Sequence, residues 1–172
     1  MISNYKKTIG IIFGGQSNEH DISIKSAKAI FNALSSHSNQ EKYISKAFYI
    51  NKSGSWFSSS ESLLFLKGEK SIEEFNSNIV SKLNFLENID SSDIDVWFPI
   101  LHGLNGEDGT IQGFMRLTQK PYVASGILGS VLGMDKIIMK LIFSHLKIPQ
   151  VKYLPIQDIK LNKANNLQKI TS

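Results

Sequence analysis

Compact apolar runs alternate with stretches of helical periodicity along the first half of the chain. Residues 8–13 and 43–50 are apolar runs bounded by turn residues, a pattern typical of buried strands. Between them, apolar residues recur at helical spacing and predict a helix over about residues 22–36. The residues that carry this spacing are Ala27, Ile30, Phe31 and Leu34. The pattern therefore predicts a strand, a helix and a second strand.

The segment after the second strand is less regular. Turn residues at 51–54 precede Trp56 and predict a hairpin extension. Ser60 and Glu61 are suited to open a short helix around residues 63–66. A second helix is indicated by the spacing of Ile72, Phe75, Ile79, Leu83 and Leu86. These two helices would form a crossover to the next strand.

A third strand and a further helix follow the crossover. Residues 94–101 form an apolar run, although Pro99 weakens the strand pattern near its end because proline has no N–H to donate. Asp108 is suited to cap the helix that follows. The inward face of this helix would carry Ile111, Phe114, Met115 and Leu117. Residues 121–124 predict a short fourth strand.

This alternation of strands and helices predicts an α/β fold with a small, doubly wound, Rossmann-like parallel sheet. We assign residues 1–125 to this N-terminal domain, and residues 126–172 to a linker and the beginning of another domain. Ligands of such sheets bind beyond the carboxyl ends of the strands.

The pattern changes in the second part of the chain. Residues 126–133 predict a turn of small residues, and a helix is expected from about Asp135 to a point before Pro149. Residues 151–156 predict another strand. The polar tail 157–172 has too few apolar residues to form a core of its own.

Composition and charge exclude several classes of protein and of binding partner. The 172 residues include no cysteine, which excludes disulfides, thiolate metal sites and a cysteine nucleophile, and which favours a reducing cytoplasm. The apolar run at 9–13 is too short for a signal peptide or a membrane span. Residues 136–172 carry seven lysines and one aspartate, but without an aromatic-interleaved basic motif. Neither a membrane nor nucleic acid is therefore the expected partner.

Two glycine-rich stretches lie where a predicted strand leads into a helix. They occupy residues 14–21, with Gly14 and Gly15, and residues 102–110, with Gly103, Gly106 and Gly109. Backbone N–H groups at a helix N-terminus favour a carboxylate or a phosphate, so we expect a small anion or zwitterion as ligand. Neither stretch matches the dinucleotide fingerprint or the P-loop, which disfavours a nicotinamide dehydrogenase or a P-loop enzyme.

Three residues are candidates for chemistry, and each also has a purely structural interpretation. Glu19 would complement a helix dipole, and His102 would be a partly buried structural histidine. Glu107 and Asp108 would then only cap a helix. Lys136 is an unfavourable cation in a first helical turn unless a phosphate faces it, although a solvated lysine is the simpler account. The four histidines show no metal-ligand spacing.

Three ordered motifs give the sequence a specific resemblance. G-G-x-S-x-E-H, then H-G-x-x-G-E-D-G-x-I-Q-G, then P-Y-V-A-S-G followed by M-D-K resemble the amino-terminal part of D-alanine–D-alanine ligases. The resemblance extends over about residues 9–155 and covers about the first half of that enzyme. It implies a pre-ATP-grasp α/β domain followed by the truncated beginning of an ATP-grasp domain. It also implies the synthesis of a peptidoglycan precursor.

The resemblance implies a role for each candidate residue. ATP would phosphorylate the carboxylate of one D-alanine, and the amine of a second would attack the acyl phosphate. Glu19 would pair with the ammonium of the first D-alanine, and His102 would lie near its carboxylate. Lys136 would hold ATP phosphates. The glycines at 14, 15, 103, 106 and 109 would let the backbone approach the substrate closely.

The resemblance also implies what this chain lacks. The family's second half supplies a further ATP lysine, a serine-bearing loop, an arginine and the Mg²⁺ ligands, so the isolated chain is expected to be inactive. D-alanine and ATP are the expected small-molecule partners, together with either a second copy or a missing C-terminal half. A D-alanine–D-lactate or D-alanine–D-serine ligase, a non-catalytic D-amino-acid-binding module and one partner of a split ligase remain alternatives.

Overall fold

The computed structural model describes residues 5–69, 71 and 91–155. Its sheet contains the strands β1 (Lys7–Gly14), β2 (Tyr43–Ile50) and β3 (Val96–Pro99), in the order β2-β1-β3. Both pairings are parallel, with Ile9 opposite Ser45 on one side of β1 and opposite Val96 on the other. The predicted first and second strands are therefore confirmed, and so is the parallel α/β class.

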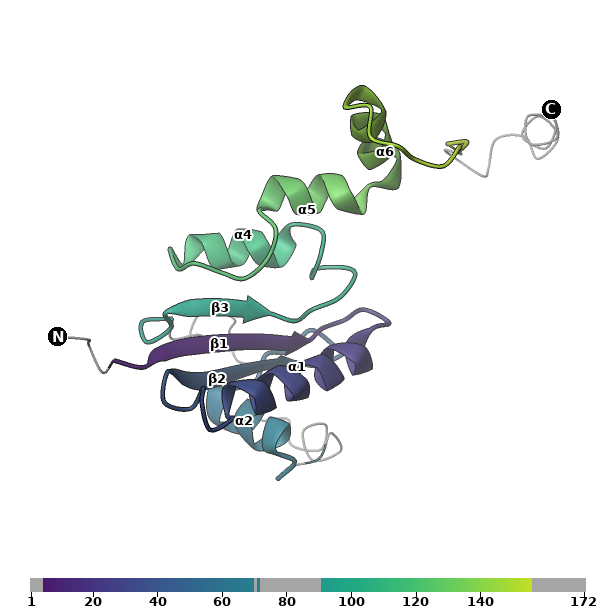
Figure 1. Cartoon of the computed structure of the whole chain (residues 1–172). Coiled ribbons are helices and arrows are strands. Elements are labelled where there is room, and N and C mark those ends of the chain that lie inside the picture. The colour runs from purple at the N-terminus through teal and green to yellow at the C-terminus, as the bar shows by residue number, and fades with distance from the viewer. Residues whose placement is uncertain (1–4, 70, 72–90, 156–172) are drawn as a thin grey trace. The chain divides into compact units, whose positions relative to one another are not determined.

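Helices cover both faces of this sheet, which confirms the doubly wound arrangement. In Figure 1, α1 (His20–Leu34) and α2 (Ser59–Lys67) lie on one side of the sheet, and α4 (Thr110–Leu117) lies on the other. Side chains alternate along β1 between two cores: Ile11 and Phe13 pack toward α1 and α2, and Ile12 packs toward α4. Because the central strand is covered on both faces, its sequence is a continuous apolar run.

α2 begins at Ser59, one residue before Ser60, which was predicted to open it. Ser58 is the N-cap: its hydroxyl oxygen accepts a hydrogen bond from the Glu61 backbone N–H and donates one to the Glu61 carboxylate. Ser58 and Glu61 have the three-residue spacing of a capping box, and the Glu61 carboxylate accepts here from the Ser58 hydroxyl. The predicted second helix over 72–86 lies outside the described residues.

The hairpin extension is shorter than predicted. Gly54 N–H donates to the Asn51 carbonyl (3.0 Å) and closes the turn, but only one antiparallel bridge follows, between Ile50 and Trp56. The turn prediction is therefore confirmed, whereas the described residues that follow the turn form a single bridge and no paired hairpin strand.

β3 occupies only the middle of the predicted strand over 94–101. It ends at Pro99, which has no N–H for a ladder, although the Ile100 N–H still donates to the Ile12 carbonyl (2.7 Å). The predicted fourth strand over 121–124 is reduced to one parallel bridge between Trp97 and Tyr122. The edge strand therefore pairs over too short a distance to count as regular structure.

α4 differs from the prediction at both ends. Its N-cap is Gly109, although Asp108 still accepts a hydrogen bond from the Thr110 N–H (3.0 Å). Leu117, predicted to face inward, is 83% exposed. At 3.6 residues per turn it lies about 240° around the helix from Ile111, which explains the error. Gln112 is buried instead, and it donates from Nε2 to the Gly106 carbonyl (2.9 Å).

The chain divides into two compact units, residues 1–131 and 132–172. The small-residue turn predicted at 126–133 is wrong, because α5 (Ile127–Met134) is helical there. Its two internal glycines do not have a positive φ, and apolar residues four apart, such as Leu128 and Leu132, support a helix in spite of them.

The predicted helix near Asp135 is confirmed as α6 (Lys136–His145). The Asp135 carboxylate caps it by accepting hydrogen bonds from the Ile137 and Ile138 N–H groups (2.9 and 3.0 Å). The strand predicted over 151–156 is wrong for residues 151–155, which have no regular structure and pair with no strand among the described residues. Residue 156 and the tail 157–172 lie outside the described residues.

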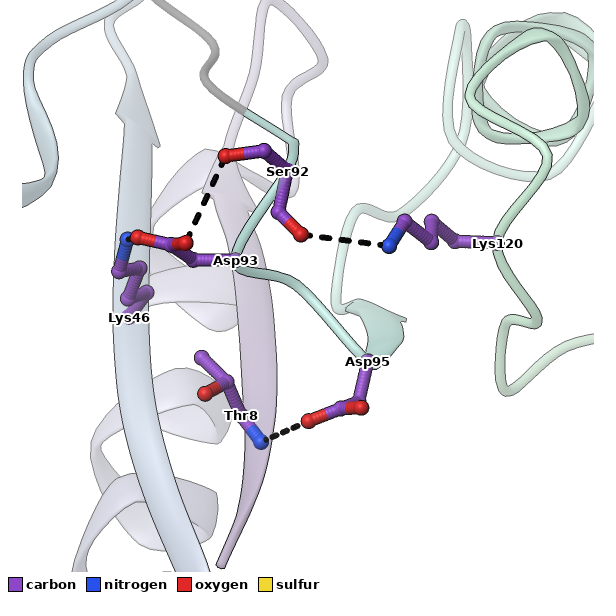
Figure 2. Close-up of polar contacts among 6 residues, drawn as sticks. All are labelled: Thr8, Lys46, Ser92, Asp93, Asp95 and Lys120. Atoms are coloured by element: carbon purple, nitrogen blue, oxygen red, sulfur yellow. Dashed lines mark hydrogen bonds and ion pairs between the residues drawn. The ribbon is translucent and has the colours of Figure 1, made fainter.

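Charged side chains form hydrogen bonds and an ion pair near the amino-terminal end of the sheet (Figure 2). The Asp95 carboxylate accepts a hydrogen bond from the Thr8 N–H (2.8 Å), and Lys46 forms an ion pair with Asp93 (3.1 Å). Lys120 donates to the Ser92 carbonyl (3.3 Å). These contacts fix the approach to β3. In the part of the chain that the structure describes, no helix is both long and apolar enough to span a membrane.

Candidate functional site

The first glycine-rich stretch forms a tight turn at the carboxyl end of β1. Gly14 and Gly15 have φ values of 92° and 90°, a conformation that favours glycine. A Cβ at Gly14 would overlap the Ile50 carbonyl oxygen, so this position also lacks space for a side chain. Gly15 N–H donates to the same Ile50 carbonyl (2.8 Å), which ties the turn to the end of β2.

Buried polar side chains from α1 and β2 support this turn. Ser23 Oγ accepts from the Gly14 N–H (2.8 Å) and donates to the Ile100 carbonyl. His20 Nδ1 lies 2.5 Å from the Gly15 carbonyl, and His20 Nε2 lies 3.1 Å from the Tyr49 hydroxyl. Burial, and to a smaller extent the Asp21 carboxylate, raises the pKa of Tyr49 to about 12. The phenol therefore stays protonated and able to donate.

The second glycine-rich stretch is held by its own acidic residues. Glu107 accepts from the Gly103 N–H (2.9 Å), and Asp108 accepts from the N–H groups of Asn105 (2.9 Å) and Thr110 (3.0 Å). Desolvation raises the pKa of Asp108, but these hydrogen bonds outweigh it and hold the pKa below its usual value. Both carboxylates thus shape the loop, in line with the structural interpretation of this pair.

The two stretches meet at the carboxyl edge of the sheet. Glu19 is the N-cap residue of α1, but its side chain makes no capping hydrogen bond. Its Oε2 instead lies 3.2 Å from the point where a Cβ on Gly103 would stand. Asn105 Nδ2 donates to Gln16 Oε1 at 3.5 Å, a second link between the stretches. The Glu19 carboxylate is therefore exposed beside the second turn and available to a cation.

A cavity of about 260 Å³ opens between these stretches and the turn after β2. The first stretch contributes Gly15 and Gln16, and His102 and Asn105 come from the second. The remaining walls are mainly apolar, and they are formed by Ile50, Gly54, Trp56, Leu101, Leu104, Thr110, Ile111 and Phe114. Glu19 does not line the cavity; it lies beside Gly103, the residue after His102. The volume is ample for a small amino acid.

His102, which lines this cavity, has one ring nitrogen without a hydrogen-bond partner among the described residues. Its Nε2 is shielded from solvent and has no hydrogen-bond partner in the described structure. A buried polar atom without a partner costs free energy, so such atoms in native proteins are commonly completed by water or a ligand. A water or a polar group of a ligand would satisfy this nitrogen of His102.

The glycines of the second stretch have close neighbours within the protein. A Cβ on Gly106 would lie 2.7 Å from Leu101, and one on Gly109 would lie 2.7 Å from Val131. These two glycines are thus required by packing, whatever their relation to a ligand. Lys136 belongs to the second unit, where its Nζ donates to the Gly133 carbonyl (3.2 Å).

Sequence reasoning identified both stretches but missed several residues that build the site. The apolar walls Trp56 and Phe114 lie 5.8 Å apart, centroid to centroid, and come from segments 58 residues apart in sequence. Ser23 and Tyr49 lie inside a predicted helix and a predicted strand, where nothing in the local pattern marks a buried hydrogen bond. The signal that was available is the polar Ser23 on the apolar face of α1.

No metal centre is evident in residues 5–69, 71 and 91–155. That part of the chain contains no group of three His, Asp or Glu side chains arranged to hold an ion. What the geometry offers is an exposed carboxylate, a histidine nitrogen without a partner and a small, mainly apolar cavity. This combination suits a small zwitterion, whose ammonium and carboxylate need separate partners.

Comparison with known proteins identifies relatives over nearly the whole chain. A family model described as D-ala D-ala ligase N-terminus matches residues 8–125. A D-alanine–D-alanine ligase of Prochlorococcus marinus subsp. pastoris is 54% identical over 171 residues, or 96% of this chain and 48% of the relative. The enzyme of the same name from Prochlorococcus marinus MIT 9312 is 56% identical, over 94% and 46% respectively. The chain thus spans about half the length of these relatives.

Solved structures give the same result for the fold. The D-alanine–D-alanine ligase of Coxiella burnetii superposes with a TM-score of 0.75 at 27% identity, over 96% of this chain and 49% of that one. The VanG D-Ala:D-Ser ligase of Enterococcus faecalis superposes with a TM-score of 0.66 at 29% identity, over 97% and 49%. Ligases with different second substrates thus share this fold.

Proposed function

Because the chain belongs to the D-alanine–D-alanine ligase family, as the match over residues 8–125 shows, we propose that it forms the N-terminal, substrate-binding half of an ATP-dependent D-alanine–D-alanine ligase. The complete enzyme would join two D-alanine molecules for a peptidoglycan precursor in the cytoplasm. The observation that carries this proposal is the approach of the Glu19 carboxylate to Gly103, the residue after His102, which itself lines a cavity of about 260 Å³.

The two ends of a D-alanine zwitterion would have separate partners in this site. The Glu19 carboxylate would accept charge-assisted hydrogen bonds from the ammonium, which fixes which end of the substrate enters. His102 Nε2, which lacks a partner in the described structure, would donate to the substrate carboxylate. Orientation matters for a ligase, since only a correctly placed carboxylate can attack the terminal phosphate of ATP.

The remaining chemistry depends on ATP and Mg²⁺. Transfer of the phosphoryl group to the first D-alanine gives an acyl phosphate, whose carbonyl is open to attack by the second amine, with release of phosphate. Lys136, at the first position of α6, would provide a positive charge for ATP phosphates. The described residues contain no cluster suited to Mg²⁺, so we assign its ligands to the half of the enzyme that the relatives have beyond this match.

A fusion protein tests the proposal directly. The whole 172-residue chain would be joined to the second half of the Prochlorococcus marinus MIT 9312 relative. We expect the fusion to form D-alanyl-D-alanine and release phosphate only when D-alanine and ATP are both present. Glu19→Gln should lower kcat/KM for D-alanine by about 10- to 100-fold, because the negative charge that strengthens the hydrogen bond to the ammonium is lost.

The matched control is Glu41→Gln, which removes an exposed carboxylate just before β2, at the amino-terminal end of the sheet. This variant should match the unmodified fusion. A folded fusion that forms no dipeptide would contradict the ligase proposal. Calorimetric binding of D-alanine by such a fusion would then favour the binding-module alternative.

The second substrate is a separate question. The structural match to a D-Ala:D-Ser ligase has nearly the same coverage as the match to a D-alanine–D-alanine ligase. We place D-alanine first because the curated relatives at 54% and 56% identity carry that name. In the fusion, competition among D-alanine, D-serine and D-lactate would report the substrate preference of the relative's second half. The second substrate of this protein must therefore be assigned with its own full-length form.

A further inference from the structure

We propose that the buried pair His20 and Tyr49 is a positioning device that holds the Gly15 carbonyl and the start of α1, and thereby aims the neighbouring Glu19 carboxylate at the first D-alanine. This inference rests on the proposed function, because it assigns the pair to the substrate site of that ligase. Neither residue would touch the substrate. Each would act through Glu19, which is bonded directly to His20 in the chain.

The hydrogen bonds of the pair define its arrangement. The Gly15 carbonyl can only accept, so His20 Nδ1 must carry the proton of their 2.5 Å contact. In the neutral ring, His20 Nε2 then has a lone pair, which accepts from the Tyr49 hydroxyl at 3.1 Å. The less common Nδ1–H tautomer is therefore selected by its two neighbours.

The imidazole ring of His20 is buried together with the phenol ring of Tyr49. His20 and Tyr49 are each only 2% exposed, and their rings meet edge to face with centroids 5.6 Å apart. Tyr49 is held in turn by contacts with Phe13, Phe57 and Phe65. Both ring nitrogens of His20 have a polar partner, as buried polar groups in folded proteins generally do.

The pair acts on the backbone that carries Glu19. Both backbone polar groups of Gly15 are hydrogen-bonded, because its N–H donates to the Ile50 carbonyl and its carbonyl accepts from His20 Nδ1. Residues 15–20 then close a short loop between β1 and α1, in which the His20 N–H also donates to the Ser17 carbonyl (3.2 Å). Glu19 lies within this loop, and its own side chain makes no capping bond that would hold it otherwise.

Two amide substitutions, each of which places an NH₂ group near one ring nitrogen, separate the roles of the two nitrogens. In the fusion enzyme, His20→Asn keeps a donor close to the Nδ1 position and should retain the bond to Gly15. His20→Gln places its amide near the Nε2 position and should lose that bond. We expect His20→Gln to raise KM for D-alanine about tenfold while KM for ATP stays within about twofold, because a small misplacement of a substrate-orienting group is costly. His20→Asn should stay within about threefold of the unmodified enzyme, since the bond to Gly15 carries the effect.

Tyr49→Phe provides a milder variant that keeps the ring packing. It should raise KM for D-alanine by a smaller factor than His20→Gln and leave KM for ATP unchanged. Equal changes in both KM values, or a loss of thermal stability with unchanged KM values, would overturn the positioning role and leave the pair purely structural. Glu19→Gln is run in parallel. If Glu19→Gln has no effect, the proposed function itself fails, whereas a strong Glu19→Gln effect with silent His20 and Tyr49 variants defeats only this inference.

A spectroscopic measurement gives a second, independent readout. With ¹⁵N-labelled histidine in the whole chain, two-bond ¹H–¹⁵N spectra report which ring nitrogen carries the proton. His20 should show the Nδ1–H pattern, and the exposed His37, whose Nδ1 faces a Gln40 amide at 3.3 Å, serves as the reference for the opposite tautomer. In Tyr49→Phe the His20 pattern should shift. An Nε2–H pattern for His20 would contradict the assigned bonds.

Discussion

The two ends of the three-stranded sheet use polar groups in different ways. At the carboxyl end, deeply buried side chains hold the first glycine turn, since Ser23 is 0% exposed and His20 2%, and the carboxylates of Glu107 and Asp108 hold the second. At the amino end, charged groups hold the strands at the surface, as the Lys7–Asp95 and Lys46–Asp93 ion pairs do. The cavity at the carboxyl end is lined by both glycine-rich stretches, and a ring nitrogen of His102 there has no partner among the described residues. A hollow of about 270 Å³ at the amino end is lined instead by residues of α1, α2, the start of β2 and the loop before it.

The contrast teaches where function is found in a small parallel sheet. Every strand of such a sheet ends at the same edge, so turns that follow β1, β2 and β3 converge there and can surround a ligand. Precise turns need glycine conformations and buried hydrogen bonds, which are sensitive to substitution. Surface ion pairs tolerate change far better. We therefore expect substitutions at the carboxyl edge to cost much more than equivalent ones at the amino edge.

Gly14→Ala should have the largest effect on stability. The residue has a φ of 92°, and a Cβ would overlap the Ile50 carbonyl oxygen, so backbone strain and steric overlap add. We expect a loss of about 3 kcal/mol or more in the free energy of unfolding, measured by urea denaturation. The control is Gly113→Ala on α4, where nothing lies within 4 Å of the new Cβ. It should gain about 0.5–1 kcal/mol from helix propensity. Equal effects of the two changes would contradict the turn argument.

Ser23→Ala should come second. The hydroxyl serves two buried backbone groups, since it accepts from the Gly14 N–H and donates to the Ile100 carbonyl. Removing it leaves both without this partner, which we expect to cost about 1–3 kcal/mol by thermal or urea unfolding. Ser26→Ala on the same helix is the matched control, because the structure shows no hydrogen bond for that side chain within the described residues. A Ser23→Ala loss no larger than the Ser26→Ala change would refute the bridging role.

These buried contacts also show which parts of the fold can be predicted from the sequence. Periodicity predicted β1, β2, α1 and α6, because each carries a long and regular apolar pattern. It failed at α5, where two glycines looked like turn residues, and at the fourth strand, whose pairing with Trp97 is limited to one bridge. Both errors concern short segments, in which local propensity is weak and tertiary packing decides.

The candidate site was predicted only in part, for a related reason. The glycine-rich stretches made Glu19 and His102 candidates, since turns at strand ends have a local signature, but their roles came only from the resemblance to the ligase family. The support from Ser23 could not be found in this way, because its partner Ile100 lies 77 residues away in the sequence. A hydrogen bond between distant segments leaves no local pattern. The roles assigned to Glu19, His102 and Lys136 stay predictions until the fusion enzyme is measured.

Asp95→Asn tests the amino edge through its dependence on pH. The Thr8 N–H, opposed by desolvation and assisted by Lys7, lowers the pKa of Asp95 below its ordinary value of 3.8. A carboxyl group whose pKa is lower in the folded state stabilises the fold above its unfolded pKa, and this contribution is lost as the pH falls through the folded pKa. Asp95→Asn should therefore be less stable than the unmodified chain at pH 7, and the difference should shrink below pH 4.

Urea midpoints across this pH range measure the Asp95 effect, and the fusion enzyme supplies the functional control. KM for D-alanine should not change in Asp95→Asn, because the side chain lies at the opposite end of the sheet from Glu19. A difference in stability that stays constant down to pH 2 would show that the carboxylate charge is not the cause. A raised KM for D-alanine would break the separation between the two edges.

Lys46→Met should have the smallest effect. The change removes the charge that pairs with Asp93 at 3.1 Å but keeps an apolar stem of similar length, so packing over β2 is retained. The Asp93 side chain is 68% exposed, and water and salt screen such a pair strongly. We expect a loss below about 0.5 kcal/mol that disappears in 1 M salt, where the screening length falls to about 3 Å. A loss as large as that of Ser23→Ala, unaffected by salt, would mean that the amino edge is as tightly built as the carboxyl edge. The distinction between a supporting edge and a binding edge would then need another explanation.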